Sequence, residues 1–286
     1  MTKSVNPQRK SCEGSRLVAP KTRNRLAAIR RAGGIFLLAL LATVPLPASL
    51  DRAQELYGRT QYREALRLLE AIPQKTGPVH DLMGKCFYRL EEYSKATDAL
   101  EKAAAAEPRN ANYRDWLGKA WGRRAETSAF FNQPRYAVRA RGHFERAVEL
   151  DPQNREALSD LFEYYLEAPG FLGGGQDKAA ALSERVRAFA PARYHSMQAR
   201  LEEKRRDFTA AERSFRQAAE LAPAEQGRLV DLARFLARQG RFAESDAAFE
   251  KAAQIAPDNA ELKFTRARTY LDSKRNQGLA RRLLEE

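Results

Sequence analysis

The sequence predicts an all-α fold, an α-solenoid built from repeated pairs of helices, and three observations support this prediction. From residue 50 onward the chain is rich in Ala, Leu, Arg and Glu and contains few β-branched residues, a composition that favours helices. Apolar residues recur there at spacings of three and four, which is typical of amphipathic helices. A phrase that ends in proline also returns along the chain, and internal repeats of this kind predict a solenoid.

The repeated phrase locates the expected helix ends. Its copies are ALEKAAAAEPRN, HFERAVELDPQN, SFRQAAELAPAE and AFEKAAQIAPDN, with a degenerate copy, ALSERVRAFAPA. Their prolines are Pro108, Pro152, Pro223 and Pro257, with Pro191 in the degenerate copy. Proline cannot donate a backbone hydrogen bond, and it disfavours helical angles in the residue before it. Each of these prolines is therefore expected to end a helix.

Small and large residues stand at fixed distances from each proline. In most copies the residues twelve and five positions before it are small, and the residue eight positions before it is large: Leu100, Phe144, Phe215 and Phe249. In the first helix of a unit, a small residue precedes a large one by three: Gly84–Phe87, Gly118–Trp121, Ala233–Leu236 and Ala267–Tyr270. Small residues let two helices approach closely, and large ones fill the space between them.

A helix–turn–helix unit of about 34 residues with this pattern resembles the tetratricopeptide repeat (TPR). The clearest copies are Gly77–Asn110, Ala192–Glu225 and Gln226–Asn259, and weaker ones lie around EALRLLEAI and from Ala260 onward. The resemblance implies a right-handed superhelix of six to seven repeats over residues 50–286. It also implies a protein- or peptide-binding scaffold rather than an enzyme.

Residues 1–49 have the order of a bacterial signal peptide. A long basic segment is followed by GGIFLLALLATV and then by the small residues of PLPAS, so cleavage is expected near Ala48. The apolar run Ile35–Val44 is shorter than the roughly 20 residues that span a bilayer. The pair Arg30–Arg31 is similar to a twin-arginine signal, although GGIF follows it. We expect a periplasmic or secreted protein, and the alternative is a membrane anchor formed by an uncleaved leader.

Most of the positive charge lies in this leader. The whole chain has 50 Lys and Arg against 37 Asp and Glu, and residues 1–49 contain nine basic residues and one acid, Glu13. The remaining chain is only mildly basic. Short clusters such as Lys204–Arg206 have acids close by, so no nucleic-acid partner is expected.

Two units are too long and predict insertions near 122–135 and 168–176. The first insertion is expected to lengthen the first helix and to add a loop with Phe130 and Phe131, either an apolar plug over the solenoid edge or part of a docking surface. The second contains PGFLGGG, but no strand precedes it and the pattern of a phosphate loop is incomplete. The glycines therefore predict a turn, with Phe171 and Leu172 as candidate partner contacts at its tip.

The sequence contains no recognisable catalytic or metal site. Its three histidines, His80, His143 and His195, have no metal-ligand spacing, and HExxH, CxxC and G-x-S-x-G patterns are absent. We therefore expect no enzyme activity and no cofactor.

The TPR resemblance places the ninth residue of each unit in the concave groove. These residues are Lys85, Lys119, Glu163, Arg200, Arg234 and Arg268, and all but Glu163 are basic. Either they form a basic row that favours acidic segments, with Tyr88 adding selectivity, or they are ordinary solvated charges. The carboxylate clamp of some family members also needs groove asparagines, and only Asn112 lies near one, so that activity does not carry over.

The predicted function is an adaptor in the bacterial cell envelope that binds a protein or peptide partner, an acidic one if the basic row is functional. The alternative is a structural subunit of an envelope complex that docks through its convex face or its inserted loops. Contact with a membrane is expected only through an uncleaved leader.

Overall fold

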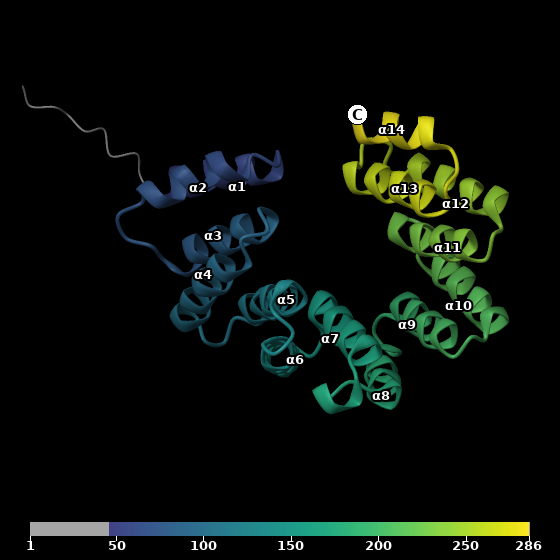
Figure 1. Cartoon of the computed structure of the whole chain (residues 1–286), viewed down its shortest axis with the longest axis horizontal. Helices are drawn as coiled ribbons and strands as arrows, with labels where there is room; N and C mark the ends of the chain where they lie inside the picture. The colour runs from purple at the N-terminus through teal and green to yellow at the C-terminus, as the bar shows by residue number, and fades with distance from the viewer. Residues whose placement is uncertain (1–45, 286) are drawn as a thin grey trace, which may run out of the picture. The chain divides into compact units, whose positions relative to one another are not determined.

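The computed structural model describes residues 46–285, and this part of the chain consists of helices joined by short turns, without a strand (Figure 1). The predicted leader over 1–49 lies almost entirely outside the described residues, and the first helix begins at Leu46. None of the helices between residues 46 and 285 combines the length and the apolar character needed to cross a membrane. The all-α solenoid expected from the sequence is confirmed.

The helices form seven consecutive pairs. They are α1 (Leu46–Gly58) with α2 (Tyr62–Ala71), α3 (Gly77–Arg89) with α4 (Tyr93–Ala106), α5 (Ala111–Thr127) with α6 (Gln133–Leu150), α7 (Arg155–Glu167) with α8 (Gln176–Val186), α9 (Pro191–Lys204) with α10 (Phe208–Leu221), α11 (Gln226–Arg238) with α12 (Phe242–Ile255), and α13 (Ala260–Asp272) with α14 (Gln277–Glu285). From α5 to α12, the odd-numbered helices form one side of the row and the even-numbered helices form the other (Figure 1).

Four of the five repeat prolines follow a helix end, as expected. Pro108, for example, comes two residues after the end of α4. The next residue but one, Asn110, then caps α5, because its Oδ1 accepts the backbone N–H groups of Asn112 and Tyr113 at 3.1 and 3.3 Å. Asn154 and Asn259 cap α7 and α13 in the same way. The motif Pro-x-Asn therefore ends one helix and starts the next.

The expectation was wrong for Pro191. This proline is the first residue of α9, and the preceding helix already ends at Val186. Proline is favoured at the first helical position because its missing N–H would have no partner there.

Small residues lie directly under large ones in the pairs α3–α4 and α5–α6. A Cβ atom on Gly84 would lie 2.4 Å from Leu100, and one on Gly118 would lie 2.6 Å from the Phe144 ring. Leu100, Phe144 and the corresponding Phe215 are buried. These contacts confirm the packing rule predicted from the offsets, and they set how closely the two helices approach.

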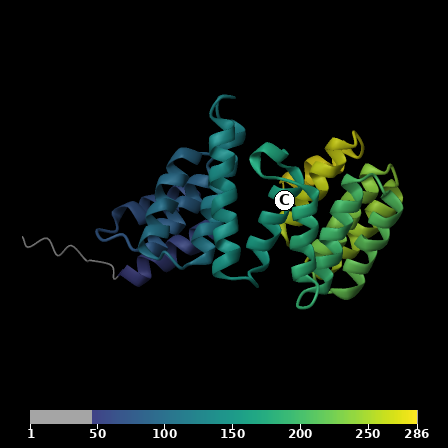
Figure 2. The same ribbon diagram turned by 90° about the horizontal axis from the view of Figure 1, so that it is seen from below.

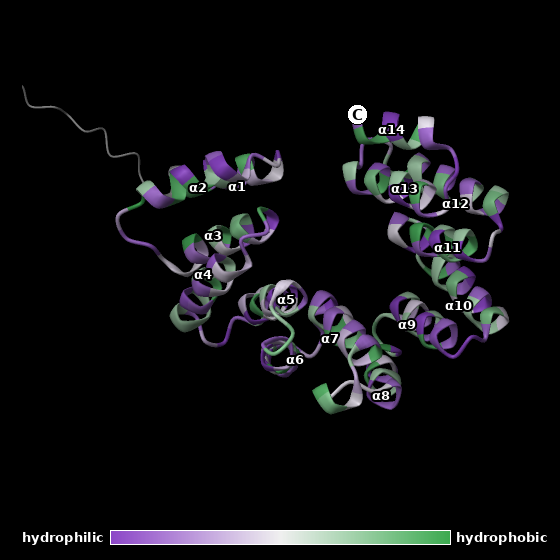
Figure 3. Ribbon diagram, viewed as in Figure 1, coloured by the Kyte–Doolittle hydropathy of each residue, from purple (hydrophilic) through white to green (hydrophobic). Residues whose placement is uncertain are grey.

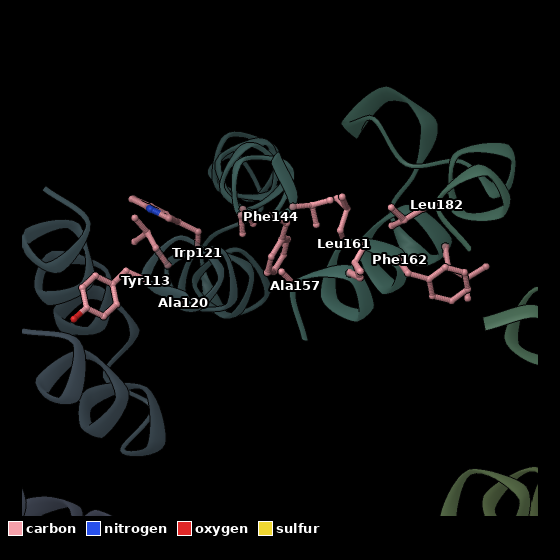
Figure 4. Close-up of a cluster of buried hydrophobic side chains, with 14 of the residues drawn as sticks. Tyr113, Ala120, Trp121, Phe144, Ala157, Leu161, Phe162 and Leu182 are labelled. Carbon is pink, nitrogen blue, oxygen red and sulfur yellow. The ribbon is translucent and has the colours of Figure 1, made fainter. Parts of the chain in front are cut away.

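Stacking of the pairs extends the core along the chain. The largest cluster of buried apolar side chains runs from Ala96 to Leu201 and includes Trp121, Phe144 and Phe162 (Figure 4). The C-terminal pairs contain smaller, separate clusters, one of them around Phe215 and Phe235.

The first insertion lengthens both helices of its pair, not only the first one. The turn between α5 and α6 covers just 128–132, and Phe130 and Phe131 at its tip are 84% and 79% exposed. The plug interpretation of these two rings is therefore wrong. The lengthened part is held together by Trp121 and Tyr136, whose ring centroids are 5.1 Å apart.

The glycines of the second insertion form a fixed turn. A short 3-10 helix, η1 (Gly170–Leu172), leads into Gly173, which has φ 88°. Three side chains donate to backbone carbonyls of this turn: Arg141 and Tyr164 to Leu172 at 3.0 and 2.9 Å, and Lys178 to Gly173 at 2.8 Å. A Cβ atom on Gly173 would lie 1.5 Å from the Arg141 guanidinium, so the position requires glycine for its angles and its space.

The packing of Gly118 can be tested against Gly122 on the same helix. We expect Gly118→Ala to lower the free energy of unfolding by about 1–3 kcal/mol, because the new methyl group forces the Phe144 ring to move. Gly122→Ala meets no atom within 4 Å and should raise it by about 0.5–1 kcal/mol through helix propensity. Urea unfolding followed by circular dichroism measures both values. Equal effects of the two substitutions would contradict the close approach.

Candidate ligand-binding groove

The predicted groove residues lie on the first helices of the pairs, on a surface that we call the groove face. Six helices contribute to it: α3, α5, α7, α9, α11 and α13. The predicted basic residues of this face differ in their partners. Those on α3, α5 and α9 form short ion pairs, and those on α11 and α13 do not.

The N-terminal part of the groove face combines two lysines with buried acids. Lys85 contacts Asp81 at 2.6 Å, and Lys119 contacts Asp115 on its own helix at 2.9 Å and Asp160 on α7 at 3.0 Å. The ammonium groups of both lysines lie over the Trp116 ring, 5.1 and 4.8 Å from its centroid. Tyr88, another predicted contact residue, packs with its ring edge-on to Trp116 at 5.6 Å.

Asp115 has the most perturbed environment of this group. Its side chain is 3% exposed. Burial and the nearby Asp160 carboxylate raise the pKa of Asp115 to about 7, against the opposing effect of Lys119. For Lys119, burial lowers the pKa, but Asp115 and Asp160 raise it more, so the lysine stays charged. One ammonium group thus compensates two carboxyl groups from adjacent pairs.

In the middle of the groove face, the arginines are also compensated. Arg200 on α9 donates two hydrogen bonds to Glu163 on α7, at 3.2 and 2.8 Å, and Glu167 and Glu203 each lie 3.5 Å from it. Arg238 on α11 binds Glu203 on α9 through two hydrogen bonds of 2.7 and 2.9 Å. The ion pairs of this region connect one helix pair to the next.

The last two predicted residues remain open to solvent. Arg234 is exposed and has no ion pair within 4.0 Å in the described part of the chain. Arg268 is 70% exposed, and its nearest carboxylate, Asp272, is 4.0 Å away. Within residues 46–285 the predicted row therefore does not present uniform positive charge, because its basic residues without a short ion pair lie in its C-terminal part.

A pocket of about 370 Å³ opens on the groove face between α7, α9 and α11. Phe162, Met197 and Phe215 provide apolar lining. Five arginines but only two carboxylates line it, so its wall carries excess positive charge; the charged residues are Arg193, Arg200, Arg228, Arg234, Arg238, Glu163 and Asp231.

Like Arg234, Arg193 has no ion pair in the described part of the chain, but it is less exposed. Its guanidinium donates to the Oγ of Ser159, and no carboxylate lies within 4.0 Å of it among residues 46–285. Its Nε is buried without a hydrogen-bond partner in this part of the chain. Burial and the neighbouring Arg228 lower the pKa of Arg193. The guanidinium is thus a partly desolvated positive charge beside an open cavity.

Arg228 and Asp231 complete the polar wall. Arg228 donates to the Ser196 Oγ at 3.0 Å and pairs with Glu225 at 3.1 Å. Asp231 lies 3.8 Å from Arg228 with its side chain 40% exposed, and partial burial raises the pKa of its carboxyl group.

Arg200 and Arg234 were predicted from the sequence as groove residues, whereas Arg193 and Arg228 were not. A signal for Arg193 was present, because it precedes Arg200 by seven residues, which is two helical turns and the same helix face. The ninth-position rule, by which only the ninth residue of each unit is assigned to the groove, does not predict the other residues on the same helix face.

The remaining candidate groups do not form a reactive centre. Burial raises the pKa of Cys86 to about 12 and lowers the pKa of His143 to about 4, so both are neutral near pH 7. No group of three or more His, Cys, Asp or Glu side chains suited to a metal ion occurs among the described residues. Phe130, Phe131 and Phe171 lie at the tips of the two insertions, and Leu172 is only partly exposed.

Comparison with known proteins agrees with this architecture. Residues 228–259 match the family model described as tetratricopeptide repeat. Subunit 3 of the anaphase-promoting complex of Dictyostelium discoideum is 39% identical over 69 residues, which is 23% of this chain but only 7% of that protein.

Solved structures show the same fold. A thermophilic TPR protein of Thermus thermophilus is similar with a TM-score of 0.54 and 20% identity, over 66% of this chain and 98% of the other. A TPR protein of Parabacteroides merdae is similar with a TM-score of 0.53 and 15% identity, over 84% and 97%. The described chain therefore has the helix-pair solenoid fold of these TPR proteins, as the repeat prolines indicated, and residues 228–259 match the repeat itself. A scaffold of this kind is consistent with a role in protein interactions.

The raised pKa of Asp115 predicts a dependence of stability on pH. Between about pH 4 and about pH 7 the folded chain keeps a proton on Asp115 that the unfolded chain releases, so the free energy of unfolding falls as pH rises through this window. The loss amounts to at most roughly 4 kcal/mol, at about 1.4 kcal/mol for each unit of pKa. Asp115→Asn should remove this part of the slope. Urea unfolding across the window measures it, and an unchanged slope in the variant would show that Asp115 titrates normally.

Proposed function

We propose that this protein is an adaptor of the bacterial cell envelope that binds acidic protein or peptide segments in the pocket between α7, α9 and α11. The observation that carries the proposal is the environment of Arg193. Its guanidinium is partly buried beside the pocket, and no carboxylate among residues 46–285 lies within 4.0 Å of it. No catalysis is assigned to the protein.

An acidic group is the ligand that satisfies this pocket chemically. A partly desolvated cation without a carboxylate partner is unfavourable, and a carboxylate entering the cavity supplies the opposite charge and an acceptor for the terminal N–H groups of the guanidinium. Arg234 on α11 also lines the pocket. It is exposed and has no ion pair within 4.0 Å in the described chain, so it can turn toward the same group without breaking an existing ion pair. Guanidinium groups suit this role because their planar donors match carboxylate geometry.

The compensated parts of the groove face have a different role. At Lys119 and Arg200 an acidic ligand would have to displace the carboxylates of Asp160 or Glu163. These sites therefore favour binding less than the pocket does. We assign orientation of the ligand's acidic group to Arg193 and Arg234, and contact with its apolar neighbours to Phe162 and Met197.

Peptide selection tests the pocket. A random peptide library displayed on phage is selected on the wild-type protein, and the best peptides are synthesised and labelled with fluorescein. We expect enrichment of Asp and Glu, and binding measured by fluorescence anisotropy should weaken about a hundredfold in Arg193→Met with Arg234→Ala, since each of the two charged contacts contributes about 1.5 kcal/mol or more.

The matched control is Arg213→Met, because Arg213 is exposed on α10 and lies outside the pocket. It should bind the selected peptides like the wild type. Circular dichroism checks the fold of the pocket variant, whose stability is expected to be unchanged or higher, because replacing Arg193 removes a partly buried charge. Peptides without acidic enrichment, or equal binding to the wild type and the pocket variant, would refute the proposal.

The cellular location in this proposal rests on the leader. Expression in a bacterial host should place the protein in the periplasmic fraction, with a mature N-terminus near Ala48 by mass spectrometry. Recovery of the chain with an intact leader in the cytoplasmic fraction would refute the envelope location. It would not contradict peptide binding in the pocket. An intact leader in the membrane fraction would instead indicate an anchored form.

A further inference from the structure

The two insertions expose large aromatic rings at one edge of the solenoid. We call this surface the insertion edge: Phe130 and Phe131 in the turn between α5 and α6, and Phe171 in η1 between α7 and α8. The three side chains are 84%, 79% and 81% exposed. Both insertions join the first helix to the second helix of consecutive pairs, and the teal α5–α6 pair extends beyond its neighbours (Figure 2). The turn that leads into α8 is coloured apolar in Figure 3.

The scaffold holds these rings in place. Arg141 of α6 donates to the Leu172 carbonyl at 3.0 Å and so connects the second insertion to the pair that carries the first. Arg124 and Arg139 pack on Trp121, 4.8 and 4.6 Å from its ring, which stiffens the lengthened hairpin. Exposed apolar rings on a fixed frame are characteristic of an interaction surface.

The charge of the insertion edge is one-sided. No acidic residue occurs between Glu126 and Glu145, and none occurs in the loop 168–176. Arg135 and Arg139 are exposed on the first turns of α6, and neither has a carboxylate within 4.0 Å among residues 46–285. Val138, 42% exposed, lies between them. Apolar rings at the tip are thus followed by a cationic band.

We propose that the insertion edge docks on the surface of an anionic phospholipid bilayer. The phenylalanine rings enter the interface between headgroups and acyl chains, and Arg135 and Arg139 contact the lipid phosphates. This arrangement fits a bilayer better than a protein partner. A bilayer accepts separate protruding rings, whereas a protein hot spot requires a complementary pocket for each of them. The surface is distinct from the groove pocket, and the two inferences stand independently.

A local optical probe tests the docking on the full-length protein. Tryptophan is placed at the edge by Phe131→Trp, and at an exposed position on α13 by Phe264→Trp, where the native ring is 53% exposed. Vesicles contain phosphatidylglycerol and phosphatidylcholine, or phosphatidylcholine alone, with brominated acyl chains as short-range quenchers. Each signal is read as the difference from the unsubstituted protein, which contains Trp116 and Trp121.

We expect a blue shift and bromine quenching for residue 131 with anionic vesicles only, and no change for residue 264. Because the readout is local, binding through residues 1–49 does not produce it. Arg135→Ala with Arg139→Ala should weaken the anionic-vesicle binding seen at residue 131 by roughly tenfold or more, since each basic residue near an anionic surface contributes about fivefold. Arg67→Ala with Arg213→Ala, two exposed arginines on other helices, is the matched control.

Three results would overturn the proposal. They are the same response from residues 131 and 264, no response from residue 131, and equal binding to neutral and anionic vesicles. In the first two cases, a protein partner becomes the remaining occupant of the insertion edge.

Discussion

The close approach of two helices within each pair, with a glycine or alanine under a large apolar side chain, is the constraint on which the rest of the structure depends. Where Gly118 faces Phe144, no room remains for even a methyl group. This contact fixes how the first helix of a pair rotates against the second. It thereby decides which residues of the first helix are turned away from the core, and so which side chains form the groove face.

The fold could be predicted from the sequence because its signals are local and repeated. Prolines, capping asparagines and small residues act within one or two helical turns, and several copies reinforce each other. Pro191 is the exception, because proline suits both the position after a helix and the first position of the next one. The position of a proline within the repeat does not by itself show whether it ends one helix or begins the next. The lengthening of α6 was missed for a related reason, since an inserted segment has no repeat against which to align it.

The charge of the groove was much less predictable. The ninth-position rule located Lys119 and Arg200 on the correct helices, but their partners, Asp160 and Glu163, belong to the preceding or following pair. The pairs Lys85–Asp81 and Lys119–Asp115 lie within one helix. The contacts with Asp160 and Glu163, however, depend on side chains that are about 40 residues away in the sequence. Arg193 shows the opposite case, in which a residue outside the ninth position becomes important because stacking leaves it without a carboxylate within 4.0 Å among residues 46–285.

The break in the hydrophobic core has a consequence for how the solenoid unfolds. The continuous cluster from Ala96 to Leu201 ends within α9, and a separate cluster around Phe215 and Phe235 begins there. In repeat proteins, stability is approximately the sum of the units and the interfaces between neighbours, so a weak interface separates two cooperative folding units. The pocket lies across this seam, with Phe162 and Met197 from one cluster and Phe215 from the other. A ligand that contacts Arg193 on α9 and Arg234 on α11 would add its binding free energy to the contact between these two helix pairs, and would thereby make them unfold more cooperatively.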